Sequence, residues 1–327
     1  MAEGERHRAL ITAPLRGPGF DRLCEMTDVV YDPWIEQQPL RLYTSPALSE
    51  RIAVEGAEVL VVEADAVGTE VFERPLRVVA ATRGDPVNID LPAATAAGVP
   101  VLHCPGRNAD AVAELAVALL FSLNRRLLAA DADVRAGEVY RNGTIPYQRF
   151  RAWQLAGRTA GIVGLGAVGR ATKWRLEGLG MRVVAHDPYA PDATHSLDEL
   201  LDEADVISMH AMVTPETTGM IGAAQFARMR DGSIYLNSAR AMLHDTDALV
   251  AALQSGHLGG AGLDHFVGEH LPTDHPLVAM KNVVLTPHIG GATYDVEANQ
   301  ASMVAADVVR VLNGERPLHC VNPEVLA

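Results

Sequence analysis

The sequence is poor in the features that mark three large classes of protein. It has only three cysteines, Cys24, Cys104 and Cys320, which are widely spaced and form no C-x-x-C or zinc-ligand pattern. We therefore expect reduced thiols and no metal site. No apolar run approaches the ~20 residues of a membrane helix. Cationic residues are also scarce, with 27 Lys and Arg against 41 Asp and Glu, so the formal net charge is −14. Such a field repels phosphate backbones, and we expect neither a nucleic-acid nor a membrane partner.

What is abundant is apolar sequence, 48% of 327 residues. At about 150 residues per domain, this length favours two domains with sizeable cores. The first residues are polar and carry no apolar signal segment, so the expected location is cytoplasmic.

The first hundred residues alternate short apolar runs with helical stretches. Strands are predicted at 9–12, 59–62, 76–80 and 99–102. A helix is predicted over 46–55, with Ser45 as its N-cap and Pro46 at its first position. Apolar strands separated by helices indicate a parallel sheet, and thus one α/β domain in this part of the chain.

A second alternation follows a long helical pattern at 108–127 and an irregular, aromatic-rich stretch at 137–153. A capping box of Ser196 and Glu199 opens one of its helices. A further helix is predicted over 293–312, where the chain could return to the first domain. Six strands, enough for a complete doubly wound sheet, are predicted at 159–163, 182–185, 206–209, 233–236, 260–263 and 283–285.

A glycine-rich hexapeptide lies directly after the strand at 159–163 and opens a helix. Its residues are Gly164, Leu165, Gly166, Ala167, Val168 and Gly169, a G-x-G-x-x-G pattern. The glycines permit a tight turn, close approach of a pyrophosphate and close helix–strand packing. Alone, the pattern is weak evidence for a dinucleotide site.

Its context strengthens that interpretation, because the next strand ends at Asp187, 18 residues after Gly169 (187 − 169). An acid there can accept hydrogen bonds from the adenosine ribose and repels a 2′-phosphate. We therefore predict NAD rather than NADP as the cofactor. The alternative is a tight turn that merely exposes an aspartate.

Three residues near the ends of later strands could carry the chemistry. Arg240 can bind a carboxylate and polarise an adjacent carbonyl, and His288 can exchange the alcohol proton while Glu269 stabilises its charged form. Singly, each has an ordinary interpretation as a capping, solvated or turn residue. Together they supply what the reduction of a 2-oxo acid needs.

At this point the sequence resembles the D-isomer-specific 2-hydroxyacid dehydrogenases, and the resemblance spans roughly residues 75 to 325. The matching motifs occur in the family's order: 108–114, the glycine hexapeptide, 236–240, 262–269 and 286–293. By this resemblance Arg240, Glu269 and His288 match the catalytic Arg, Glu and His. Positions lining the family's adenosine and nicotinamide sites are matched by His210, Ser238, Ala239, Asp264 and Gly290.

The resemblance also implies the architecture. We expect an α/β protein of two Rossmann-like or flavodoxin-like doubly wound parallel-sheet domains separated by a cleft. The substrate-binding domain would comprise 1–103 and be completed by 292–327, and the NAD-binding domain would comprise 104–291. A homodimer is expected through the helix that starts near Asn108 and the aromatic stretch after it.

Several positions depart from the family pattern. Where the family usually has a Gly-x-Gly loop that holds the substrate carboxylate, this chain has Arg83, Gly84 and Asp85. Arg83, together with Arg149, could recognise a second polar group on the substrate, or it could simply pair with Asp85. Acids at Glu63 and Asp65 would repel a phosphate, which argues against a phosphoglycerate substrate.

The predicted function is that of an NAD-dependent oxidoreductase, transferring a hydride between the nicotinamide and a 2-hydroxy or 2-oxo acid. An alternative is an NAD(H)-sensing protein like the transcriptional corepressors built on the same fold. Those proteins carry peptide-binding extensions, whereas this sequence shows no disordered tail.

Overall fold

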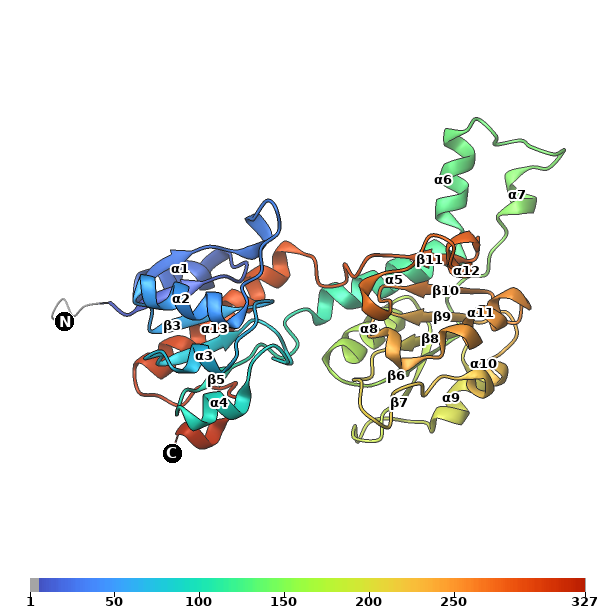
Figure 1. Ribbon diagram of the computed structural model, residues 1–327. Coiled ribbons are helices and arrows are strands. Elements are labelled where there is room, and N and C mark those ends of the chain that lie inside the picture. Colours follow the sequence, from blue (N-terminus) through green and yellow to red (C-terminus); the bar gives the residue numbers. More distant parts are fainter. Residues whose placement is uncertain (1–5, 327) are drawn as a thin grey trace. The chain divides into compact units, whose positions relative to one another are not determined.

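The computed structural model describes residues 6–326, which divide into two compact α/β units (Figure 1). One unit takes its described residues from Met1–Arg107 and Thr293–Ala327, and the other comprises Asn108–Ala292. The predicted division, after residues 103 and 291, lies four residues and one residue earlier than these boundaries. The predicted fold class is confirmed, because both units are built on all-parallel sheets.

The first unit contains a five-stranded sheet in the order β2-β1-β3-β4-β5. Its strands are β1 (Arg8–Ile11), β2 (Asp28–Tyr31), β3 (Val59–Val62), β4 (Val78–Ala81) and β5 (Val101–Leu102). Its helices are α1 (Gly17–Met26), α2 (Ser45–Glu55), α3 (Thr69–Phe72), α4 (Leu91–Ala96) and α13 (Tyr294–Leu312), with 3-10 turns η1 (Trp34–Glu36) and η4 (Pro323–Leu326). Every residue of β3 and β4 is buried, as expected for parallel strands covered on both faces.

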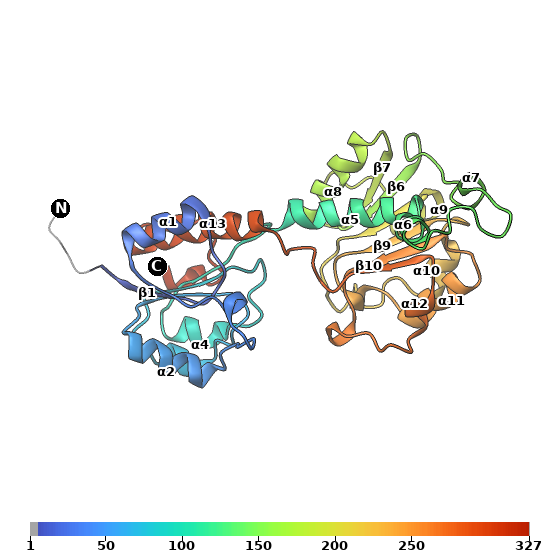
Figure 2. The same ribbon diagram turned by 90° about the horizontal axis from the view of Figure 1, so that it is seen from above.

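The C-terminal helix α13 belongs to this first unit and packs along α1, as Figure 2 shows. The two backbones come so close that a Cβ at Gly19 would lie 2.3 Å from the backbone nitrogen of Ser302. The N-cap of α13 is Thr293, whose side chain accepts a hydrogen bond from the backbone of Val296. Glycine is therefore required where α1 crosses α13.

The second unit contains a six-stranded sheet in the order β11-β10-β9-β8-β6-β7. Its strands are β6 (Thr159–Val163), β7 (Arg182–His186), β8 (Val206–Met209), β9 (Ile234–Asn237), β10 (Gly260–Leu263) and β11 (Val283–Leu285). Its helices are α5 (Ala109–Asn124), α6 (Leu127–Arg135), α7 (Pro146–Arg149), α8 (Ala167–Gly178), α9 (Leu197–Glu203), α10 (Ala223–Arg228), α11 (Thr246–Gln254) and α12 (Pro276–Ala279), with 3-10 turns η2 (Ala241–Leu243) and η3 (Val267–Glu269). Helices α5 and α8 pack against each other, and α5 also contacts β9, β10 and β11.

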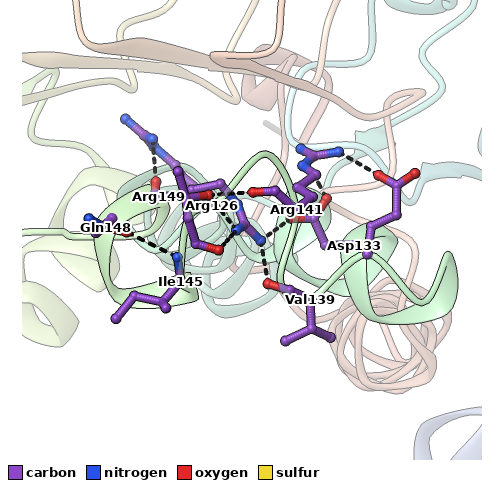
Figure 3. Close-up of polar contacts among 9 residues, drawn as sticks. Arg126, Asp133, Val139, Arg141, Ile145, Gln148 and Arg149 are labelled. Carbon is purple, nitrogen blue, oxygen red and sulfur yellow. Dashed lines mark hydrogen bonds and ion pairs between the residues drawn. The ribbon is translucent and has the colours of Figure 1, made fainter.

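Helices α6 and α7 form an arm that projects from the body of the second unit (Figure 1). Arg149 holds the arm together, as Figure 3 shows. Its guanidinium donates to the Asp133 carboxylate at 2.9 Å, the Val139 carbonyl at 2.9 Å and the Thr144 hydroxyl at 2.9 Å. Arg141 adds a second ion pair to Asp133 at 3.1 Å.

Three local predictions need correction. Strand β2 was not predicted, since it is an edge strand of four residues without a fully buried side chain. Ser45 is not the N-cap of α2; Thr44 occupies that position, and the Ser45 hydroxyl accepts from Gly68 and donates to Glu70. The stretch at 137–153 is not wholly irregular, because it contains α7. No helix within residues 6–326 is long and apolar enough to cross a membrane.

Candidate cofactor and active site

The glycine hexapeptide lies between β6 and α8, where the strand order of the second sheet reverses. Gly164 has φ +94°, and a Cβ there would lie 2.4 Å from the backbone nitrogen of Ala211, in the loop after β8. A Cβ on Gly169 would lie 2.0 Å from the Gly164 carbonyl oxygen, whereas Gly166 faces open space. The loop is thus tight on its protein side and open at the N-terminus of α8, as an incoming pyrophosphate requires.

Asp187 lies at the carboxyl end of β7, next to this loop. Its carboxylate accepts hydrogen bonds from the backbone nitrogens of Leu165 at 2.7 Å and Tyr189 at 2.9 Å. The nearby Arg170 is held in a two-bond ion pair by Asp192, at 2.5 and 2.7 Å. Asp187 therefore fixes the glycine loop, and the nearby cation is already paired.

The ends of β8 and β9 present two polar groups without partners in the described chain. The Nε2 of His210 shares a hydrogen bond with the Ser208 hydroxyl at 2.8 Å, while its Nδ1 is buried and has no hydrogen-bond partner. Burial lowers the pKa of His210 to about 4, which keeps the ring neutral. The Ser238 hydroxyl is likewise buried and unpaired, and Ala239 follows it. These groups suit a polar ligand at this edge of the sheet.

The turn that carries Arg240 is organised by Asn237, which the sequence analysis did not single out. The Asn237 side chain accepts from the Ala239 backbone at 3.0 Å and donates to the Arg240 carbonyl at 2.8 Å. It also donates to Nδ1 of buried His244 at 3.0 Å. Burial lowers the pKa of His244 to about 4, so this imidazole stays a neutral acceptor. The exposed Arg240 side chain thus rests on a fixed turn.

Glu269 and His288 meet as predicted: the Glu269 Oε1 lies 3.0 Å from the His288 Nδ1. Both residues have left-handed backbones, with φ of +53° and +55°. Such conformations cost free energy in non-glycine residues and cluster at functional sites. The His288 ring also lies against the His265 ring, with ring centroids 3.8 Å apart and ring planes tilted by 51°. The sequence analysis did not single out His265, although a histidine that closely follows a predicted strand and lies four residues before Glu269 could have been named as a candidate site residue.

Asp264 supports the loop that carries His288. Its fully buried carboxylate accepts from the Thr286 hydroxyl at 2.6 Å and from the backbone nitrogens of Ile289 at 2.9 Å and Gly290 at 2.8 Å. These three donors occupy both oxygens. The direct role of Asp264 in this structure is therefore to shape the 286–290 loop.

The proposed substrate loop follows β4 in the first unit. Gly84 and Asp85 are exposed, Arg83 is half-buried, and the Gly84 carbonyl faces the His103 ring nitrogen at 2.8 Å. Within residues 6–326 no ion pair joins Arg83 to Asp85, so that alternative is not what the structure shows. Arg149 is committed to the arm.

The acids expected to repel a phosphate do not present free carboxylates. Asp65 is fully buried, accepting from the Thr12 hydroxyl at 2.5 Å and the Tyr43 backbone at 2.7 Å. Glu63 is paired with Arg107. Arg107 thus offsets the charge of Glu63, and Asp65 is turned away from solvent, which weakens the electrostatic argument against a phosphorylated substrate.

A doubly wound domain with a glycine-rich phosphate loop, an acid after the second strand and an Arg, Glu and His at the strand ends defines an NAD-dependent oxidoreductase. Comparison with known proteins gives the family. Residues 117–290 match the NAD-binding domain of the D-isomer specific 2-hydroxyacid dehydrogenases. The chain belongs to this family, which confirms the resemblance, the enzyme class and NAD as cofactor.

Individual relatives are similar along their whole length. A glyoxylate reductase of Thermofilum pendens is 34% identical over 98% of this chain and 96% of its own. The crystal structure of the TT0316 protein of Thermus thermophilus has a TM-score of 0.81 at 37% identity, covering 96% of this chain and 99% of that one. The NAD-complexed D-isomer specific 2-hydroxyacid dehydrogenase of Lactobacillus delbrueckii ssp. bulgaricus has a TM-score of 0.80 at 25% identity, covering 97% and 100%.

Proposed function

We propose that the enzyme reduces a small 2-oxo acid with NADH, and oxidises the corresponding 2-hydroxy acid in reverse. The observation that carries this proposal is the 3.0 Å pair of His288 and Glu269 at the end of the NAD-binding sheet. Burial, followed by the nearby His288 and Arg240, lowers the pKa of His265, and this effect of Arg240 supports its assignment to the same site. The glyoxylate reductase relative supports a short 2-oxo acid as the substrate class.

The cofactor residues fit NAD, since Gly164, Gly166 and Gly169 leave room where a side chain would collide or block approach. We assign the pyrophosphate to the start of α8, with Ala167 and Val168, and the ribose hydroxyls to Asp187. The remaining contacts, around the adenosine and nicotinamide, are assigned to His210, Ser238, Ala239 and Gly290, with Asp264 acting through the loop that it holds. When bound, NADH supplies the hydride that reduces the carbonyl carbon.

The chain's own residues bind the substrate and supply the proton that the reduction needs. Arg240 donates hydrogen bonds to the substrate carboxylate and polarises the adjacent ketone. Because Nδ1 of His288 faces Glu269, its Nε2 is the atom that gives a proton to the developing alkoxide. Glu269 orients the ring and stabilises its cationic form. In the oxidative direction neutral His288 takes the alcohol proton at the same nitrogen.

The loop of Arg83, Gly84 and Asp85 is proposed to contact the substrate as well. No ion pair engages Arg83 within the described residues, so its charge is available to a second anionic group on the acid. Arg83→Ala should raise the KM for dicarboxylic acids more than for monocarboxylic acids. An unchanged KM ratio would remove Arg83 from substrate recognition.

NADH oxidation against a panel of 2-oxo acids tests the function. The panel should include short, branched, aromatic, dicarboxylic and phosphorylated members, with Arg240→Ala as the loss-of-function variant. Arg228→Ala is the control, because that arginine pairs with exposed Asp198 and Asp202 instead. Turnover that is lost only in Arg240→Ala supports the proposal. Tight NADH binding with no turnover of any member would favour the NAD(H)-sensing alternative.

We further propose that the protein is a homodimer joined through α5 and the arm. The arm and its flanks expose large apolar side chains at Leu127, Leu128, Val134, Tyr140, Ile145, Tyr147 and Trp153. Apolar surface of this kind favours burial against another protein surface. Light scattering should give twice the chain mass of 34.9 kDa. A single species at the chain mass would contradict the dimer.

A cytoplasmic location is proposed from the cysteines. Cys24, Cys104 and Cys320 are all free thiols, as expected in a reducing compartment. Cell fractionation with a tagged chain tests this directly, and recovery in an oxidising compartment would contradict it.

A further inference from the structure

The loop of Arg83, Gly84 and Asp85 lies against the segment that follows β5. The Arg83 carbonyl accepts a hydrogen bond from the backbone nitrogen of Cys104 at 2.8 Å. The Gly84 carbonyl accepts one from Nδ1 of His103, also at 2.8 Å. Because a carbonyl oxygen only accepts, this Nδ1 carries the hydrogen. Two successive carbonyls of the loop are therefore held toward the same segment.

The direction of these carbonyls determines where the N–H groups of the loop point. In a trans peptide unit the C=O and the N–H point in opposite directions. The N–H groups of Gly84 and Asp85 therefore point away from His103 and Cys104. Among the residues that the structure describes, neither N–H donates a hydrogen bond, and both residues are exposed. Successive N–H groups of this kind bind anions, so the loop offers two donors to a carboxylate.

The loop takes this shape without relying on the conformational freedom of glycine. Neither Arg83 nor Asp85 has a positive φ, so both positions accept an ordinary side chain. A Cβ on Gly84 would lie 3.6 Å from the Cys104 carbonyl oxygen, which is an ordinary contact. The direction of the loop therefore depends on the two hydrogen bonds to its carbonyls, and His103 makes the one that comes from a side chain.

His103 is itself held by the end of the chain. Its backbone nitrogen donates to the His319 carbonyl at 3.3 Å, and the two imidazole rings meet edge to face with centroids 6.2 Å apart. The His319 Nδ1 lies 2.9 Å from a carboxylate oxygen of Asp307 in α13, a residue only 1% exposed. Asp307 also accepts from the backbone nitrogens of Leu318 and His319, at 2.7 and 3.0 Å. The His103 ring thus packs against a neighbour that a buried carboxylate fixes.

We propose that His103 is a positioning residue for substrate binding. Its Nδ1 holds the Gly84 carbonyl, so that the N–H groups of Gly84 and Asp85 are directed at the substrate carboxylate, while His103 itself does not touch the substrate. This inference rests on the proposed function, in which the 83–85 loop contacts the 2-oxo acid. A carboxylate has about four lone-pair sites, so it can accept from Arg240 and from the loop together.

The proposal predicts which kinetic constant changes. The loop holds a part of the substrate that does not react, so it contributes equally to the bound substrate and to the transition state. Loss of such an interaction raises KM and leaves kcat unchanged. A role of His103 in general stability alone would not separate the two constants in this way.

Substrate kinetics of two His103 variants test the role of the donor. His103→Phe keeps a ring beside His319 but removes the nitrogen. His103→Asn keeps a donor at the same place, since Asn Nδ2 and His Nδ1 are both bonded to Cγ. In His103→Phe the KM for the 2-oxo acid should rise about three- to tenfold, the factor that one net hydrogen bond contributes to an equilibrium, with kcat within about twofold of wild type. His103→Asn should keep a KM within about twofold of wild type.

His257→Phe is the matched control. The Nε2 of His257 lies 3.0 Å from the Phe226 carbonyl in the second unit, so this variant loses a histidine–carbonyl bond far along the chain from the 83–85 loop. Its KM for the 2-oxo acid should equal that of wild type. If His103→Phe does not fold, His103→Ala takes its place, because it removes the donor without adding volume.

A wild-type KM in His103→Phe, or a KM in His103→Asn as high as in His103→Phe, would overturn the proposal. Hydrogen exchange of the 82–88 peptide gives a second readout that needs no turnover, and it should be faster in His103→Phe than in wild type and His103→Asn. Faster exchange without turnover of any 2-oxo acid would refute the proposed function but retain the role of His103 in holding the loop. Turnover with unchanged KM and unchanged exchange would do the reverse.

Discussion

Replacing Asp264 with Asn should loosen the loop that positions His288. The carboxylate accepts three hydrogen bonds, one from Thr286 and two from the backbone nitrogens of Ile289 and Gly290. Hydrogen bonds to a charged group contribute about 1.5–3 kcal/mol each. Asn retains one acceptor oxygen but turns its NH₂ group toward a backbone donor. Because the remaining bonds can partly adjust, we expect a net loss of about 2–4 kcal/mol in the unfolding free energy.

Two assays measure this effect separately. Urea unfolding of the full chain reports the global loss, and hydrogen exchange of the 286–292 peptide reports the loop itself. The control is Asp274→Asn, an exposed aspartate in the preceding loop with no side-chain hydrogen bond among the described residues. The role of Asp264 in holding the loop would be refuted by two results together. These are an unfolding free energy within about 0.5 kcal/mol of wild type, the range expected for an ordinary surface substitution, and unchanged hydrogen exchange of the 286–292 peptide.

Other positions give further tests. Gly169→Ala places a Cβ 2.0 Å from the Gly164 carbonyl oxygen, so the loop must shift and the protein should lose stability. The NADH Kd, measured by fluorescence titration, should rise at least about tenfold. Wild-type affinity would contradict the close contact between Gly164 and Gly169. The pKa of His244 falls to about 4 from its unfolded value near 6.5, so its neutral form stabilises the fold above pH 6.5 and that stability is lost as pH falls toward 4. Between about pH 6.5 and pH 4, the unfolding free energy of His244→Phe should therefore fall by about 3 kcal/mol less than that of wild type, as measured by urea titration. An equal pH dependence of the unfolding free energy in the two proteins would contradict this role of His244. Ser196→Ala removes the capping-box bond to Glu199 and should cost about 1 kcal/mol by thermal unfolding; no shift would mean the cap is unused.

The fold was largely predictable because buried parallel strands are continuous apolar runs. The strands at 59–62, 159–163, 206–209 and 260–263 occur with the predicted bounds, and every one of their residues is buried. Edge strand β2 was missed, and its apolar run is only three residues long, Val29 to Tyr31, with none of these residues fully buried. An edge position alone does not hide a strand, because edge strand β11 was predicted with its exact bounds, 283–285, although its residues are only half-buried.

The candidate site also has parts that could be predicted from the sequence and parts that could not. The glycine loop was predictable because its three glycines are close together in sequence and follow an apolar strand, although the neighbour that restricts Gly164, Ala211, lies 47 residues further on (211 − 164). The contact between the His265 and His288 rings joins residues 23 positions apart (288 − 265), which no local pattern encodes. The burial of Asp65 against Thr12 is equally non-local, so the sequence did not reveal that this carboxylate lies away from solvent.

The central claim is that His288 transfers the proton in an NADH-dependent reduction. The most direct measurement is kcat for a 2-oxo acid together with the NADH Kd in wild type and His288→Gln. We predict that kcat falls roughly 10²-fold or more while the NADH Kd changes less than about twofold. Near-normal turnover in His288→Gln would contradict the account.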